Sequence, residues 1–209
     1  TEVFDAKADE TAVPGNYDIE VVQLAESAKS RSGNFTSEGE VVGLGSLAIS
    51  LGADSFNVAV DSNNNTLAGL RDAINAASDN PGITASIINV DGGPQLVFSA
   101  NEAGAANTVT VAAVDDDAGD GFDLARLDSA NLTVVDAAKD ASFMLDGQLV
   151  TRGSNSVSDV ITGLTLDLKK AEIGTEETLT ISLDKASVKS KVTGVVDAFN
   201  SLSDVMKSL

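Results

Sequence analysis

The side chains best suited to binding a ligand lie in one acidic, glycine-bearing segment, VDDDAGDGFDLARLD, residues 114–128. Its aspartates and glycines are typical of a calcium-binding loop, in which carboxylates alternate with other residues around a sharp turn. Aligned on the EF-hand pattern from Asp116, the third position is Ala118 and the twelfth is Leu127. The twelfth position must supply a bidentate carboxylate, so the match fails. We therefore predict a solvated loop and assign no metal ligand.

Catalysis has few other candidates, because the chain of 209 residues contains no histidine and no cysteine. Without cysteine there is no thiol nucleophile, no disulfide framework and no zinc–thiolate site. Without histidine, the side chain that most often transfers protons near neutral pH is missing. We assign no catalytic, cofactor-binding or metal-binding residue, expect no cofactor, and predict that the protein is not an enzyme.

Two arginines in acidic surroundings are the remaining candidates for a specific polar contact. Arg71 lies in the segment TLAGLRDAIN, and Arg152 ends the segment FMLDGQLVTR. Each is a candidate for an ion pair between subunits or between domains. A local salt bridge is the favoured expectation for both.

The net charge is −19, from 13 basic and 32 acidic residues. Such a surface repels phosphate, so we expect neither nucleic acid nor membrane as a partner. No stretch is long and apolar enough to span a membrane. Residues 43–135 hold 12 acidic and 2 basic residues, whereas residues 185–209 hold 4 lysines and 2 aspartates. The middle of the chain is therefore predicted to be a solvated acidic body, unlike the C-terminal segment.

Most of the chain is predicted to form β-strands joined by tight turns. Residues 17–21 alternate between apolar and polar, and two further alternating runs flank Gly52-Ala53-Asp54 as a hairpin. A second hairpin is expected on Asp146-Gly147, and residues 27–40 are expected to be a hairpin or a loop. Further strands are predicted over residues 83–90, 95–99, 107–114, 164–168 and 177–184.

One helix is predicted to begin after Thr66, a good N-cap residue, with Leu67, Leu70, Ile74 and Ala77 on a single face. Three apolar residues on one face are what a helix needs to pack on a sheet, so we expect Leu67, Leu70 and Ile74 in the core and not at an interface. Asn80-Pro81-Gly82 should end this structure and turn the chain into the next strand.

The second half of the chain predicts a shortened version of this unit. The hairpin on Asp146-Gly147 is followed by SNSVSDVITG, residues 154–163, in which a serine would cap one or two helical turns. The strand over residues 164–168 follows. Hairpin, small helix and strand would thus occur twice.

The C-terminal segment has a different pattern. Its apolar residues recur at spacings of 4 and 3 and form a heptad seam of Val188, Val192, Val195, Phe199, Leu202, Met206 and Leu209. Asp184 is a candidate N-cap. A single core-facing helix of a globular domain would give a similar pattern, and that alternative carries equal weight. Because the seam runs to Leu209 without a cap or a breaker, we expect the helix to continue in a longer protein.

Three stretches resemble known flagellar proteins. TLAGLRDAIN, residues 66–75, resembles the IN motif shared by axial proteins of the bacterial flagellum, including flagellins and hook-associated proteins. YDIEVVQLA, residues 17–25, and FMLDGQLVTRGSNSVSDVITG, residues 143–163, resemble segments of the flagellar filament cap family, the hook-associated proteins called FliD. The IN motif alone indicates the flagellar axis, and the other two stretches indicate the cap.

The resemblance implies an α+β, predominantly β fold. Two β-rich head domains, one inserted in the other and each with a small helix, would be followed by the start of a long helix. One head domain would comprise residues 1–42 and 136–184. The inserted head domain would comprise residues 43–135 and contain the IN-motif helix, and residues 185–209 would begin a truncated helical leg.

The resemblance also implies a function. Proteins of this family form a homo-oligomeric ring outside the cell, at the tip of the flagellar filament, where they promote the folding and insertion of exported flagellin. The partners implied are therefore other copies of the chain and flagellin.

Two alternatives stay open. A flagellin or a hook–filament junction protein would share the IN motif, although residues 143–163 argue against it. A bacterial surface adhesin module would bind host mucin or glycans, and exposed aromatic side chains that stack on sugars would support it. The chain has only seven phenylalanines, one tyrosine and no tryptophan.

Overall fold

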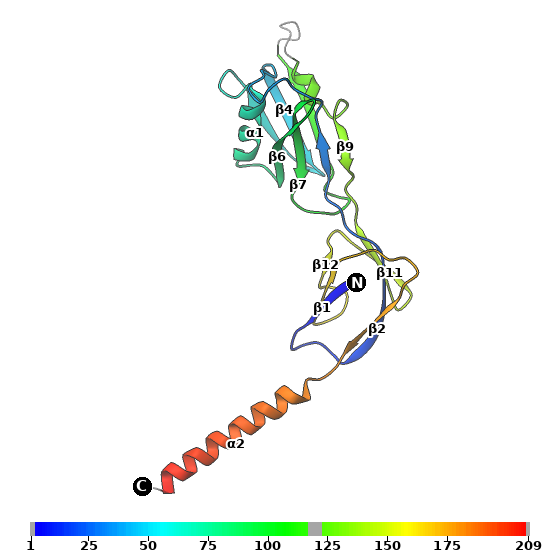
Figure 1. Cartoon of the computed structure of the whole chain (residues 1–209), viewed down its shortest axis with the longest axis vertical. Helices are drawn as coiled ribbons and strands as arrows, with labels where there is room; N and C mark the ends of the chain where they lie inside the picture. The colour runs from blue at the N-terminus through cyan, green and yellow to red at the C-terminus, as the bar shows by residue number, and fades with distance from the viewer. Residues whose placement is uncertain (1–2, 117–122, 208–209) are drawn as a thin grey trace.

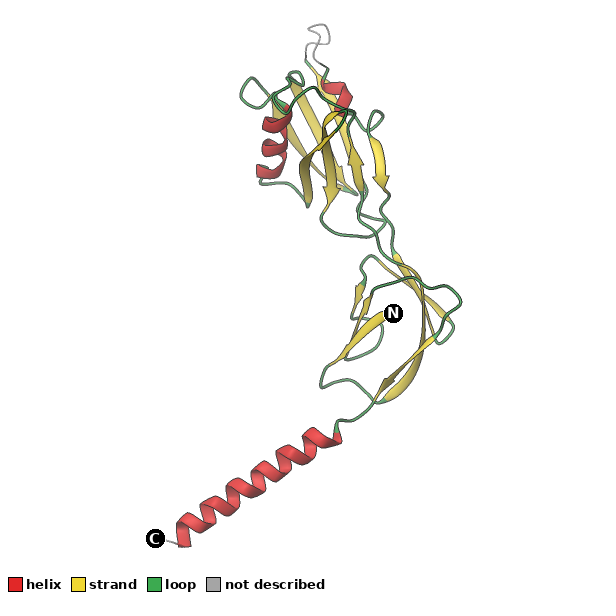
Figure 2. Ribbon diagram, in the orientation of Figure 1, coloured by secondary structure: helices red, strands yellow, loops and turns green. Residues whose placement is uncertain are grey.

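The computed structural model describes residues 3–116 and 123–207, which form two β-rich bodies followed by a long helix (Figure 1). Strands are the main regular secondary structure of both bodies and are joined by loops (Figure 2). The two α-helices are α1 (Leu67–Ala76) and α2 (Lys185–Lys207). We call the body next to α2 the proximal body (residues 3–27 and 139–184) and the other the distal body (residues 28–138). The predicted fold class, predominantly β with few helices, is confirmed.

The proximal body contains two antiparallel sheets, with strand orders β1-β13-β12 and β11-β10-β2-β14. Alternation places Ile19, Val21 and Phe143 on the buried side, where each is at most 1% exposed, and Val21 lies opposite Phe143 in the ladder. The predicted alternation of residues 17–21 is therefore confirmed. The strands are β1 (Phe4–Ala8), β2 (Gly15–Gln23), β10 (Ala141–Leu145), β11 (Gln148–Arg152), β12 (Ser156–Val157), β13 (Leu164–Leu168) and β14 (Glu177–Ile181).

The distal body also contains two antiparallel sheets, with strand orders β6-β7-β3-β9 and β5-β4-β8. One core cluster joins both sheets to α1 through residues such as Leu47, Phe98 and Leu70. A short 3₁₀ helix, η1 (Leu124–Leu127), adds two buried leucines to it. The strands are β3 (Lys29–Arg31), β4 (Gly45–Leu51), β5 (Asp54–Val60), β6 (Ile83–Val90), β7 (Gly93–Ala100), β8 (Val109–Asp115) and β9 (Thr133–Asp136).

Helix α1 begins and packs as its sequence predicts. The Thr66 hydroxyl accepts a hydrogen bond from the Gly69 N–H at 3.1 Å, which satisfies one of the free donors of the first turn. Leu67, Leu70 and Ile74 are fully buried, so the helix face belongs to the core. Burying three such side chains contributes about 1.5–3 kcal/mol each.

Two asparagines join the end of α1 to strand β6. The Asn75 side chain donates to Ala85 O and accepts from the Ala85 N–H, both at 2.8 Å, as a neighbouring strand would. Asn80 Nδ2 donates to Ile74 O at 3.1 Å, and its Oδ1 accepts from the Ile83 N–H at 2.7 Å. In the IN motif, Ile74 thus contributes a core side chain, and the Asn75 amide forms the hydrogen bonds that the backbone of a neighbouring strand would form.

Both predicted hairpins are confirmed. Strands β4 and β5 pair around a turn at Gly52 (φ +59°), with Leu51 opposite Asp54. Strands β10 and β11 pair around Asp146 (φ +46°) and Gly147 (φ +75°). Positive φ at both central residues matches the right-handed twist of the flanking strands, which is why Asp-Gly favours this turn.

The helix predicted over residues 154–163 is wrong. The structure has the two-residue strand β12 there, paired with β13, and then turns through Gly163 (φ +74°). Val157 and Ile161, four residues apart, are both buried. This spacing is typical of a helix, but here a strand followed by a turn produces it. Ser154 Oγ accepts from the Ser156 N–H at 3.1 Å, so this serine stabilises a local turn and not a helix start.

The strand ladders favour domain boundaries that differ from the predicted ones, which followed residues 42 and 135. Residues 28–42 were assigned with the proximal part, but β3 pairs with β7 and β9 inside a distal sheet. Ala28, Phe35 and Val42 belong to the distal core cluster. Because a β-strand belongs where its ladder and its buried side chains lie, we propose domains of residues 3–27 with 139–184, and 28–138. Residues 27–40 thus contain a short central strand where a hairpin or a loop was expected.

Candidate functional site

No cluster suited to chemistry occurs in the part of the chain that the structure describes. Among those residues, no group of three or more acidic side chains is placed to hold a metal ion. The acidic segment tested as a calcium loop lies partly outside the described residues, and Leu127, at its twelfth position, is a buried core residue. No described helix has the length and the hydropathy that crossing a membrane requires. The candidate functional site described below is an exposed apolar surface on α2.

Exposed apolar side chains form a stripe along α2. Val192, Val195, Phe199, Leu202 and Met206 are between 58% and 70% exposed, and they repeat at spacings of 3 and 4. We call these five residues the α2 seam. Val196, 50% exposed, widens it. The side chains of Val188 and Leu209, at the predicted ends of the seam, are not among those described.

Exposure of the α2 seam is unfavourable in water. Each side chain of this kind contributes about 1.5–3 kcal/mol when it becomes fully buried. A stripe at heptad spacing is what one helix presents to another in a coiled coil or a bundle. The arrangement is therefore suited to binding an apolar helical surface.

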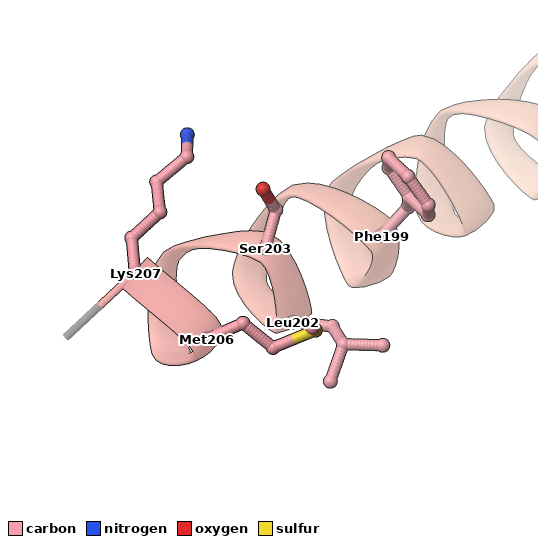
Figure 3. Close-up of a pocket in the computed structure, with 5 residues that line it drawn as sticks. All are labelled: Phe199, Leu202, Ser203, Met206 and Lys207. Atoms are coloured by element: carbon pink, nitrogen blue, oxygen red, sulfur yellow. The ribbon is translucent and has the colours of Figure 1, made fainter. Parts of the chain in front are cut away.

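The C-terminal end of the α2 seam forms an open depression of about 450 Å³. It is lined by Phe199, Leu202, Ser203, Met206 and Lys207, as Figure 3 shows. Leu202 and Met206 project to the same side of the helix, and the Lys207 side chain extends away from them (Figure 3). The depression is thus apolar at its base, with a cation at its border.

Both arginines of the sequence prediction form local ion pairs. Arg71 Nη2 lies 2.7 Å from Asp72 Oδ1, its neighbour in the chain. Arg152 Nε lies 2.9 Å from Asp159 Oδ2. The hydrogen bond to Arg152 lowers the pKa of Asp159, and the same bond raises the pKa of Arg152. The favoured expectation of a local salt bridge is confirmed for both.

One polar cluster in the distal body was not predicted. Arg126 Nη1 lies 2.7 Å from Glu40 Oε1, and its guanidinium stacks 3.9 Å from the centre of the Phe35 ring. Burial acts to raise the pKa of Glu40, but hydrogen bonds from Thr36 and Arg126 outweigh it and lower that pKa to about 2. Arg126 and Glu40 lie 86 residues apart in the sequence, so no local pattern could reveal the pair. The cluster fixes η1 to the segment that precedes α1.

Aromatic side chains offer little surface for binding sugars. Of the described aromatic residues, four phenylalanines are buried in the two cores, and Phe4 and Tyr17 are partly buried. Phe199, 69% exposed, lies on α2. The described β-rich bodies therefore present no exposed ring of the kind that the adhesin alternative needs.

Two family models match the chain. Residues 46–102 match the flagellin hook IN motif, and residues 138–209 match the C-terminus of flagellar hook-associated protein 2. The first match contains residues 66–75 and the second contains residues 143–163, the two stretches whose resemblance pointed to these proteins.

A curated relative is also similar to nearly the whole chain. The chain is 37% identical to the B-type flagellar hook-associated protein 2 of Pseudomonas aeruginosa, over 97% of this chain and 46% of that protein. It thus spans about half the length of the curated relatives that it matches.

Two crystal structures share the fold. FliD from Pseudomonas aeruginosa PAO1 superposes with a TM-score of 0.85 at 35% identity, covering 96% of this chain and 93% of that one. The D1-D2-D3 domains of the flagellar cap protein FliD from Escherichia coli give a TM-score of 0.84 at 29% identity, covering 100% of this chain and 60% of that one. Similarity of sequence and fold over nearly the whole chain shows that it belongs to the FliD family of flagellar hook-associated proteins.

Proposed function

We propose that the protein is a structural subunit of the bacterial flagellar filament cap. It acts outside the cell, at the filament tip, as part of a homo-oligomeric ring that promotes folding and insertion of exported flagellin. The observation that carries the proposal is similarity over nearly the whole chain to the crystal structures of Pseudomonas aeruginosa FliD and of the Escherichia coli flagellar cap protein FliD. The flagellin or junction-protein alternative is disfavoured, because residues 138–209 match the hook-associated protein 2 model.

Surfaces, and not reactive side chains, would carry out this work, so we propose that the protein is not an enzyme. The described residues offer no metal cluster, and the polar side chains best suited to reach a partner, Arg71 and Arg152, are occupied by local carboxylates. The α2 seam is exposed and available to a partner. It supports the assignment of residues 185–209 to a helical leg that packs with other helices.

The acidic surface sets the conditions for assembly. Residues 1–184 hold 9 basic and 30 acidic residues, a net charge of −21, so copies of this chain repel each other at low salt. Added salt screens that repulsion over distances of about 10 Å at 0.1 M. We therefore expect self-association of this chain to be weak at low salt and to strengthen as salt is added. Light scattering that finds tight oligomers at low salt, which dissociate as salt rises, would contradict this account.

The proposal is tested by replacing two residues of the α2 seam, Phe199→Asp and Leu202→Asp, in the full-length protein of a flagellated bacterium. Charges in an apolar helical interface should block assembly, so the strain should shed flagellin into the medium and grow few filaments. A matched control is Leu149→Asp on β11, where the side chain is 65% exposed and outside the α2 seam. Normal filament growth after deletion of the whole gene would overturn the cap proposal.

Adhesion is the second candidate function, with host mucin or glycans as the ligand. No exposed aromatic residue of the described β-rich bodies favours it. Saturable binding of purified chain to immobilised mucin, insensitive to added salt, would be needed to support it.

A further inference from the structure

Two chain crossings connect the proximal and distal bodies. At the crossing, Glu26 and Lys139 form an isolated antiparallel bridge in which each N–H donates to the other residue's carbonyl, at 2.9 and 3.0 Å. Lys139 Nζ also lies 2.9 Å from Glu26 Oε2. Two paired segments can still bend and twist together, because domain hinges consist of a few such residues that absorb changes in φ and ψ. The crossing alone would therefore act as a hinge.

A third contact comes from the loop between β7 and β8, residues 101–107, which we call the latch loop. The Gly104 N–H donates to Glu26 O at 3.2 Å, and the Ala105 N–H donates to Asp140 Oδ1 at 2.6 Å. Ala103 packs against the core of the proximal body, although the strands on either side of it belong to the distal body. The tip of the latch loop is thus seated on the proximal body.

The base of the latch loop is fixed to the distal body. The Asn101 N–H donates to Gly82 O at 2.9 Å, and the Gly52 N–H donates to Thr108 O at 2.9 Å. Within the loop, Asn107 Nδ2 donates to the Ala103 carbonyl at 2.6 Å. The loop is therefore a braced projection of the distal body.

Gly104 sets how closely the latch loop approaches the proximal body. It is buried, its φ is +111°, and a Cβ added to it would lie 2.8 Å from the Gly153 carbonyl oxygen. An L-residue would be strained at this φ, and a contact with backbone at 2.8 Å could be relieved only by a shift of the latch loop or of the Gly153 backbone. Glycine at position 104 thus permits the latch loop to lie this close to the proximal body, which a residue with a Cβ would prevent.

We infer that the latch loop locks the hinge, so that the proximal and distal bodies move as one rigid unit. Two crossing segments alone permit rotation about the line between them, and a third contact between the bodies restricts that rotation. The latch loop supplies it through two hydrogen bonds and an apolar side chain. The inference rests on contacts within this chain and does not depend on the proposed function.

The test measures the distance between the two bodies by pulsed dipolar electron spin resonance. The chain contains no cysteine, so the paired substitutions Asn57→Cys on β5 and Thr180→Cys on β14 give one exposed label site in each body. We expect a single narrow distance distribution for the labelled parent. Gly104→Ala and, separately, Asp140→Ala should broaden it. Thermal unfolding of each variant, followed by circular dichroism, checks that both bodies stay folded.

Two matched control variants distinguish the loss of the latch-loop contacts from a general effect of backbone strain. Asp140→Asn keeps an acceptor oxygen for the Ala105 N–H and should leave the distribution narrow. Gly174→Ala imposes the same kind of strain, at φ +82°, where nothing lies within 4 Å of the added Cβ, and should also leave it narrow. If Gly104→Ala unfolds the distal body, comparing the distance distributions of Asp140→Ala and Asp140→Asn still tests the inference. A broad distribution in the parent, or a narrow one in Asp140→Ala, would overturn the inference.

Discussion

Helices α1 and α2 carry the same kind of apolar stripe with opposite outcomes. In α1, three apolar residues at spacings of 3 and 4 are fully buried against the distal sheets. In α2, five at the same spacings are more than half exposed. The periodicity of a sequence therefore predicts that a helix has an apolar face, but it does not tell which part of the structure covers that face.

The largest difference between the two helices is expected in the unfolding free energy when one large side chain of each stripe is replaced by alanine. Leu70→Ala should lower the free energy of unfolding of the distal body by about 2–5 kcal/mol, because it leaves a cavity in a packed core. Phe199→Ala, which removes a larger side chain, should change the unfolding free energy of this chain by less than about 0.5 kcal/mol, because its site is exposed. Urea denaturation measures both, and equal losses would show that α2 is already covered.

The segment that carries α1 should be sensitive to acid. The pKa of Glu40 falls from its ordinary value of 4.5 to about 2 on folding, so its carboxylate stabilises the folded state above pH 4.5. That contribution is lost as the pH falls from 4.5 through 2. Glu40→Gln should lower the unfolding free energy at pH 7 by about 1.5–3 kcal/mol, as expected for charge-assisted hydrogen bonds.

The pH dependence identifies the cause of that loss. The difference between Glu40→Gln and the parent should shrink as the pH is lowered toward 2, because the parent carboxylate then becomes protonated. Denaturation curves at pH 7, 4.5 and 2.5 measure it. A difference that stays constant over this range would show that the ionised carboxylate contributes nothing.

The Ile-Asn pair gives α1 a polar anchor as well as its apolar face. Asn75→Ala should lower the unfolding free energy by about 1–3 kcal/mol, since it leaves the Ala85 N–H and carbonyl without their partner. Amide hydrogen exchange at Ala85 should accelerate. Asn57→Ala, at an exposed position on β5, serves as the control and should have little effect.

The smallest effect on stability is expected for a charge on the α2 seam. Leu202→Asp should leave the unfolding of both bodies unchanged to within about 0.5 kcal/mol, because the side chain is 58% exposed. Together with the loss of filament growth expected from the same residue in the full-length protein, this would separate a surface that serves assembly from one that serves folding. A large loss of stability would place Leu202 in a core.

Much of this fold follows from local patterns in the sequence. Residues 17–21 alternate as a half-buried strand, Thr66 caps α1, and Asp146-Gly147 adopts the positive φ angles that its turn needs. Each of these depends on residues within a few positions of each other. The predictions succeeded there for that reason.

The failures share a different cause. Strand β3 has the sequence Lys-Ser-Arg, and it is central in its sheet only because β7 and β9 lie on either side of it. Residues 154–163 have a helical spacing, but β13 offers β12 a ladder that no neighbour in the sequence reveals. The Glu40–Arg126 pair and the latch loop likewise join distant segments. Local sequence patterns do not predict contacts between segments that are distant in the sequence and that the chain topology brings together.

The insertion of the distal body within the proximal body has a consequence for the order of folding. Strand β2 pairs with β10 and β14, so the proximal sheet cannot form until both ends of the chain are present. Glu26 and Lys139 are 113 residues apart, and closing so long a flexible loop costs more conformational entropy than closing a short one. Once the distal body has folded, the same two residues are already neighbours. Folding of the distal body therefore accelerates formation of the proximal sheet, in which β10 and β14 pair with the much earlier strand β2.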